Sequence, residues 1–148
     1  KLIPLNKKQV KELLEIIKQQ YIVKKLELDY IFFKSPECKI FLLSNDFKDF
    51  ECKNLNINSL GLYFANTKGK SIRLSVEGSQ IIGNVANKNI LELNDEDIRE
   101  WLRGDDLNTK EKDGYFIIKN KTDFYGCGKI SNGKLMNFVP KERRMESI

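Results

Sequence analysis

The feature that most constrains the fold is a pair of short strand-like segments near the end of the sequence, the first of which is interrupted by glycines. Residues 124–130 alternate as a strand does but carry glycines at positions 126 and 128. Ser131-Asn-Gly133 follows, a strong signal for a tight hairpin turn into residues 134–139. Glycine inside a strand marks a bend or a close backbone approach. These features predict a small, strongly bent sheet or pseudo-barrel.

The residues before this hairpin predict a strand, a short helix and a second strand. Residues 90–93 and 115–119 are apolar segments of strand length. Between them, Asn94 is a suitable N-cap for a helix whose acidic first turn complements the helix dipole. Gly104 stands where a glycine commonly ends a helix. We therefore expect a short helix beside the bent sheet.

The first half predicts one amphipathic helix followed by antiparallel strands. Apolar residues recur at helical spacing over residues 7–20, after Asn6 as the N-cap. The strand-like segments that follow are 25–33, 39–43, 59–65 and 71–76, and residues 46–51 predict a short irregular turn. Residues 77–83 predict a short helix or the joint between the halves. The expected fold class is α+β, with a helix and antiparallel sheet module at 1–76 and a β pseudo-barrel with a short helix at 77–148.

The positive charge of the chain is concentrated at its end. The formal net charge is +5, and the segment from Gly114 to Ile148 carries seven Lys and Arg against three Asp and Glu. This segment therefore holds four of the five excess charges. Such a field attracts phosphate and releases counterions on binding. An ordinary lysine-rich, solvated face gives the same pattern, so the charge alone does not decide.

Composition argues against membrane, disulfide and metal classes. No apolar segment approaches bilayer length, and the opening residues lack the apolar block of a signal peptide. The three cysteines, Cys38, Cys52 and Cys127, are an odd number without metal-clip spacing, and the chain has no histidine. We expect free thiols in a reducing, cytoplasmic protein without a metal or another cofactor.

Motifs for catalysis are incomplete. Gly69-Lys-Ser71 and Gly128-Lys129 end like phosphate-binding loops, but neither has the required earlier glycine. Without histidine, a serine or cysteine nucleophile lacks its usual base. Asp105-Asp106 is expected to be surface charge, although a metal-binding or acid–base pair stays open as an alternative. The sequence therefore predicts no catalytic residue.

The residues that remain as candidates combine glycine, aromatic, amide and basic side chains in the last part of the chain. Lys129 and Lys134 flank the tight turn and could converge on one phosphate path. Tyr125 could stack on an unpaired base or pack in the core, and the glycines could admit another backbone or form bends. The full set of candidate RNA-binding residues is Tyr125, Gly126, Gly128, Lys129, Lys134, Asn137, Lys141, Arg143 and Arg144.

Three segments of the second half carry a resemblance to a known family. They are Asp123-Phe-Tyr-Gly-Cys-Gly-Lys129, Gly133-Lys-Leu-Met-Asn137 and Pro140-Lys-Glu-Arg-Arg144, after a lead-in of Trp101-Leu-Arg-Gly-Asp-Asp-Leu107 and Gly114-Tyr115. Together they resemble the PUA-like domain at the end of Nol/Nop/Sun-family RNA cytosine-5 methyltransferases. Met136 departs from the pattern, which has lysine before Asn137. The order of elements in the first half is similar to the pre-PUA module of small Nip-type ribosome-assembly factors.

The resemblance implies binding of structured RNA without catalysis. The methyl-donor loop and the catalytic cysteine dipeptides of such enzymes are not in this sequence. The expected ligand is ribosomal RNA during assembly or modification, with transfer RNA as the next candidate. A different hypothesis is an adaptor whose near-neutral first half docks an RNA-modifying enzyme or a ribosome-assembly factor.

Overall fold

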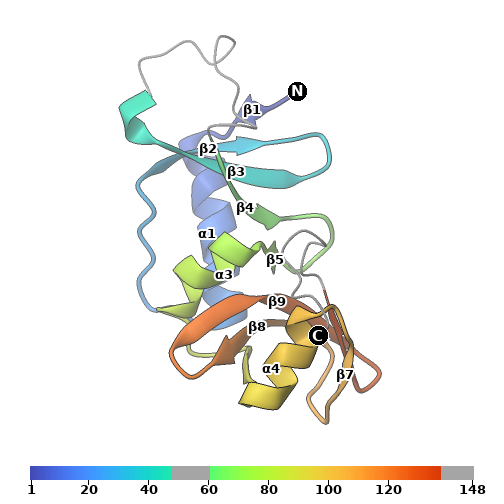
Figure 1. Ribbon diagram of the computed structural model, residues 1–148. Helices are drawn as coiled ribbons and strands as arrows, with labels where there is room; N and C mark the ends of the chain where they lie inside the picture. The colour runs from blue at the N-terminus through green and yellow to red at the C-terminus, as the bar shows by residue number, and fades with distance from the viewer. Residues whose placement is uncertain (48–60, 138–148) are drawn as a thin grey trace.

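The computed structural model describes residues 1–47 and 61–137 (Figure 1). The described part contains three α-helices and two five-stranded sheets, which confirms the α+β class. The predicted turn at 46–51 and the start of the strand predicted at 59–65 fall partly outside the described residues. The same holds for the end of the strand predicted at 134–139.

The first sheet is antiparallel and has the order β1-β2-β3-β4-β5. Its strands are β1 (Ile3–Pro4), β2 (Tyr30–Lys34), β3 (Lys39–Ser44), β4 (Leu62–Asn66) and β5 (Arg73–Leu74), and a short 3-10 turn, η1 (Asn45–Phe47), follows β3. Helix α1 (Lys7–Tyr21) begins at the predicted N-cap Asn6, which forms a capping box with Gln9, and buries Leu13, Ile17 and Tyr21. The capping and periodicity signals were therefore sufficient to place this helix.

Two predicted strands of the first half are shorter than expected. The strand predicted at 25–33 begins at Tyr30, whose backbone N–H donates to Leu28 O, so residues 25–29 lie in a connection. The strand predicted at 71–76 ends at Leu74 because Ser75 caps a helix. Its Oγ accepts from Gly78 N (2.9 Å) and donates to Tyr63 O (2.6 Å). Helix α3 (Val76–Gly83) follows, which confirms the short helix among the two alternatives predicted for residues 77–83.

The second sheet has the order β6-β8-β9-β10-β7 and curls into a half-barrel beside α4 (Figure 1). Its elements are β6 (Ile90–Glu92), α4 (Asp95–Leu102), β7 (Leu107–Asn108), β8 (Gly114–Asn120), β9 (Asp123–Ser131) and β10 (Lys134–Asn137). Only the β6–β8 pair of this sheet is parallel. Asn94 caps α4 by accepting from Asp97 N (2.8 Å), as predicted. Gly104 follows that helix with φ +103°, as expected for a terminating glycine.

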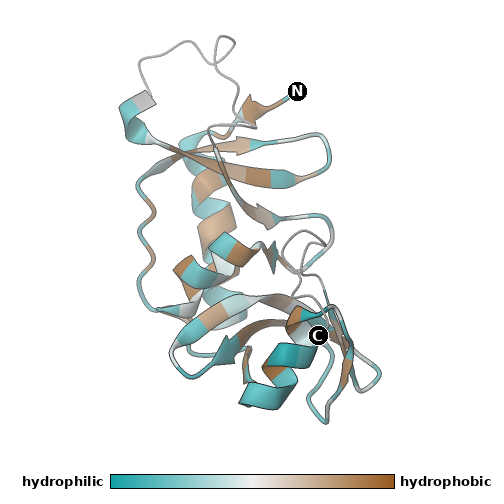
Figure 2. Cartoon of the chain, in the orientation of Figure 1, coloured by the Kyte–Doolittle hydropathy of each residue, from teal (hydrophilic) through white to brown (hydrophobic). Residues whose placement is uncertain are grey.

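One hydrophobic core joins the two halves. Ile17 and Tyr21 of α1 share it with Phe64 of the first sheet and with Ile117 and Cys127 of the second. Helix α3 packs against both β4 and β9. Hydrophobic residues recur on the strands of both sheets, whereas most residues of α4 are hydrophilic (Figure 2). The division at residues 76 and 77 stays a prediction.

Candidate functional site

Lys129 and Lys134 lie on the same face of the β9–β10 hairpin. In the register of the two strands, Lys129 is opposite Met136 and Lys134 is opposite Ser131. Side chains alternate between faces, so the two lysines are diagonal neighbours, typically about 7–8 Å apart. Lys134 is exposed, and Lys129 is half-buried. This register places two positive charges where one phosphate path could contact both.

Tyr115 supports Lys129 from the adjacent strand. The two residues are paired between β8 and β9, and Lys129 Nζ lies 5.9 Å from the centroid of the Tyr115 ring. A cation above an aromatic face is attracted by the ring quadrupole, which restricts the lysine without neutralising it. The sequence interpretation did not include Tyr115 among the candidate residues, because its pairing with Lys129 depends on the register between β8 and β9.

Gly126 and Gly128 are buried, and packing explains both. Gly126 has φ +138°, a region that side-chain-bearing residues rarely adopt, and an added Cβ would lie 3.4 Å from Trp101 Cη2. A Cβ on Gly128 would lie 2.5 Å from Leu135 Cδ1 and 3.1 Å from Met136 O. The sequence left two roles open for these glycines, admission of another backbone or a bend in the strand. The structure supplies a direct reason for the second role, the tight packing of a bent strand.

Asn137 ties the end of β10 to the turn after α4. Its side-chain Nδ2 donates to Trp101 O and, at 3.4 Å, to Asp105 O. Its backbone N donates to Asp106 Oδ1 at 3.1 Å. These contacts give Asn137 a positioning role, and they place Asp106 in a structural hydrogen bond.

Tyr125 is half-buried and packs against the cluster that contains Trp101. It also lines a shallow pocket of about 390 Å³ between α3 and the β8–β9 turn. The remaining candidates from the sequence, Lys141, Arg143 and Arg144, lie outside the described residues.

Cys127 is unsuited to nucleophilic chemistry. Its side chain is buried, and burial raises the pKa of the thiol to about 12. Because the thiolate is the reactive form, the thiol is inert near neutral pH. Tyr21 contacts it within the shared core, where burial likewise raises the pKa of the phenol. Both groups therefore contribute to packing.

The geometry of the carboxylates does not build a metal centre within the described ranges. Among residues 1–47 and 61–137, no three His, Cys, Asp or Glu side chains lie close enough together to hold an ion. Asp95 contacts Asn120 and, at 3.4 Å, Lys121 Nζ. The hydrogen bond from Asn120, followed by the contact with Lys121, lowers the pKa of this carboxyl.

No helix in the described part is both long and apolar enough to cross a membrane.

Comparison with known proteins defines the class of the second half. Residues 88–145 match the family model for the PUA domain of methyltransferase RsmF. This part of the chain is therefore a PUA domain that resembles the C-terminal domain of Nol/Nop/Sun-family methyltransferases, as the motifs had indicated.

A curated relative extends the similarity beyond that domain. The chain is 30% identical over 114 residues to ribosomal RNA small subunit methyltransferase F of Aeromonas hydrophila subsp. hydrophila. The aligned part covers 76% of this chain and 23% of the relative. The second half, residues 77–148, has 72 residues, so an alignment of 114 residues also includes part of the first half. The chain thus spans about a quarter of that enzyme's length, and the family model matches its PUA domain alone.

Proposed function

We propose that the chain binds structured RNA through its PUA domain, without catalysis of its own, and that the RNA is ribosomal. The observation that carries the proposal is the PUA match at residues 88–145. The activity in the relative's name, ribosomal RNA methyltransferase, supports the choice of ribosomal RNA over transfer RNA. A role in ribosome assembly or modification and a cytoplasmic location belong to the same proposal.

Phosphate contacts supply most of the affinity in this proposal. Lys129 and Lys134 share one face of the hairpin, and Lys141, Arg143 and Arg144 follow in the basic end of the sequence. Arginine offers a planar set of donors that suits phosphate, and lysine acts as a point charge. Gly126, Gly128, Tyr125 and Asn137 act in this scheme by fixing the shape of the hairpin.

A triple substitution tests the proposal. Lys134→Ala/Arg143→Ala/Arg144→Ala should weaken binding to a ribosomal RNA hairpin. It should also flatten the dependence of log K on log salt by about 0.7–0.9 for each phosphate that the variant no longer neutralises. The readout is filter binding at several salt concentrations. Binding equal to that of the parent at every salt concentration would contradict the proposal.

A labelled methyl donor, incubated with the chain and RNA, separates this proposal from an enzymatic one. No incorporation is expected, because the family model matches only the PUA domain. The adaptor hypothesis stays as the alternative for the first half, and a pull-down with the full chain would test it.

A further inference from the structure

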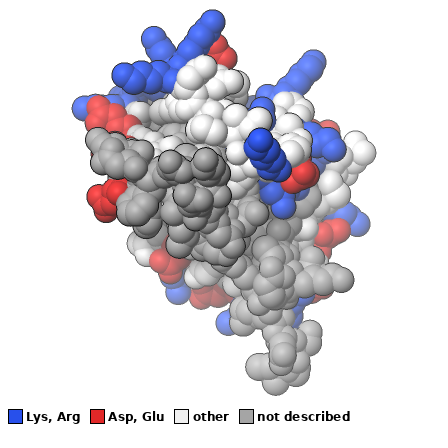
Figure 3. All heavy atoms as spheres, turned by 90° about the horizontal axis from the view of Figure 1, so that it is seen from above, with Lys and Arg blue, Asp and Glu red and all other residues white. Residues whose placement is uncertain are grey.

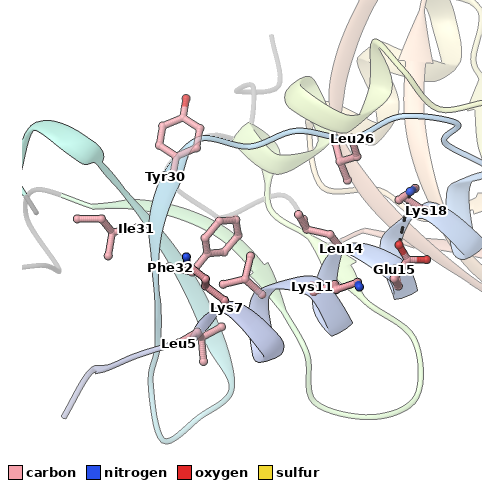
Figure 4. A pocket seen from close by; sticks show the side chains of 11 residues that line it. Leu5, Lys7, Lys11, Leu14, Glu15, Lys18, Leu26, Tyr30, Ile31 and Phe32 are labelled. Carbon is pink, nitrogen blue, oxygen red and sulfur yellow. Dashed lines mark hydrogen bonds and ion pairs between the residues drawn. The ribbon is translucent and has the colours of Figure 1, made fainter.

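A groove in the first half has the properties of a binding site for single-stranded RNA. It has a volume of about 500 Å³ and lies between α1 and the chain that leads into β2. Its floor is apolar and includes Val10 and Leu14 from the helix and Leu26 and Phe32 from the opposite side (Figure 4). Its size is that of a ligand pocket.

Lysines form a line along the helical side of the groove. Lys7, Lys11 and Lys18 all line it, and the first two are one helical turn apart, about 6 Å along the axis. Of the described residues that line the groove, Glu15 alone is acidic, and it contacts Lys18 Nζ at 3.5 Å. Neither Lys7 nor Lys11 has an ion pair within the described part of the chain. Seen from above, Lys and Arg side chains project in groups at the edges of this face of the molecule, with Asp and Glu side chains among them (Figure 3).

Tyr30 places an aromatic ring at the opposite side of the same groove. It is 41% exposed, and its hydroxyl points away from the helix (Figure 4). Exposed tyrosine beside an apolar floor leaves a ring face available for stacking. Grooves that bind single-stranded nucleic acid combine these two elements, a cationic path for the backbone and aromatic rings for the bases.

We infer that this groove binds a single-stranded segment of RNA, with phosphates along Lys7 and Lys11 and a base against Tyr30. The inference takes its ligand class from the proposed function but uses residues outside the PUA domain. An aliphatic peptide would match the floor and leave the line of lysines without counter-charges. RNA matches both sides of the groove.

The test uses the full chain and a short fluorescein-labelled oligouridine, which lacks secondary structure. Lys7→Gln/Lys11→Gln should lower the slope of log K against log salt by about 1.4, because a single strand contributes about 0.7 per phosphate contact. The control Lys8→Gln/Lys24→Gln removes the same charge from exposed lysines that do not line the groove and should keep the parental slope. Fluorescence anisotropy gives both values.

Tyr30 has its own pair of variants. Tyr30→Leu keeps an apolar side chain and should weaken oligouridine binding about fivefold or more, the loss expected for one base stack. Tyr30→Phe keeps the ring and should bind as the parent does. Circular dichroism and thermal unfolding establish that each variant is folded.

The outcomes also separate this inference from the proposed function. Parental oligouridine binding by Tyr30→Leu, or equal salt slopes for the groove and control pairs, overturns the inference. An acidic helical peptide that requires Lys7 and Lys11, and that oligouridine does not displace, overturns it as well. Loss of oligouridine binding in the groove variants supports the inference. This holds even if Lys129→Gln/Lys134→Gln leaves binding of a hairpin RNA unchanged, a result that would contradict the proposed function alone.

Discussion

Gly128 allows β9 and β10 to pack closely, and adding a single methyl group there tests that packing. The Cβ of Gly128→Ala would lie 2.5 Å from Leu135 Cδ1, where an unstrained carbon contact needs about 3.5–4.0 Å. Leu135 is fully buried and cannot turn into solvent. We expect a loss of about 1–3 kcal/mol in the free energy of unfolding, as for other overpacked cores. For a chain of this size, each kcal/mol lowers the midpoint of thermal unfolding by about 2–4 °C.

A double-mutant cycle tests whether the side chain of Leu135 causes the loss of stability in Gly128→Ala. Leu135→Ala alone should cost about 2–5 kcal/mol because it leaves a cavity. In the double variant, the new methyl group enters space that Leu135 has vacated, so the combined loss should be smaller than the sum by about 0.5–3 kcal/mol. Urea unfolding with unchanged m-values is the assay. Strict additivity, or parental stability of Gly128→Ala, would refute the claim that Leu135 excludes a side chain at position 128.

Two further predictions concern the shared core and its edges. Ser75→Ala should lower the free energy of unfolding by about 1 kcal/mol or more, because it removes both the cap of α3 and the hydrogen bond to Tyr63 O. Urea unfolding measures this loss. An unchanged midpoint would count against a stabilising role of the cap. The pKa of Cys127 is raised to about 12 in the folded chain, so the unfolded chain loses its thiol proton first, and stability should fall as pH rises from about 9 to 12. Cys127→Ala should show a shallower alkaline decline in thermal unfolding scans, and an identical decline would contradict this assignment.

Local signals were enough for α1 and α4, two of the three helices in the described part of the fold. Residues 7–20 and the helix after Asn94 have both a cap and an apolar stripe, and α1 and α4 begin where those caps predict. The short strands β1 and β7 were not predicted, since two residues carry no periodicity and each strand exists only through its pairing with β2 or β10. Ser75 shows a third case, in which a cap ends a segment whose apolar pattern favours a strand.

The candidate site was predictable to the extent that the hairpin turn sets its register. The turn at Ser131-Asn-Gly133 places Lys134 opposite Ser131, and this brings Lys129 and Lys134 to one face. The pairing of Lys129 with Tyr115 depends instead on β8 and on the irregularity after Ile118, which no local pattern specifies. The buried environment of the glycines likewise depends on Leu135 and Trp101, which lie elsewhere in the chain.

The continuous core relates the two candidate surfaces to each other. Helix α1 carries Lys7, Lys11 and Lys18 toward solvent and buries Ile17 and Tyr21 in the core that includes Ile117 and Cys127. Its last turn is also held by Asn89, which donates to Gln20 O at 2.7 Å. The groove and the PUA sheet are therefore attached to one packed unit. An RNA long enough to contact both would bind its second surface as an intramolecular event, so its affinity should exceed that for either surface alone without any additional contact.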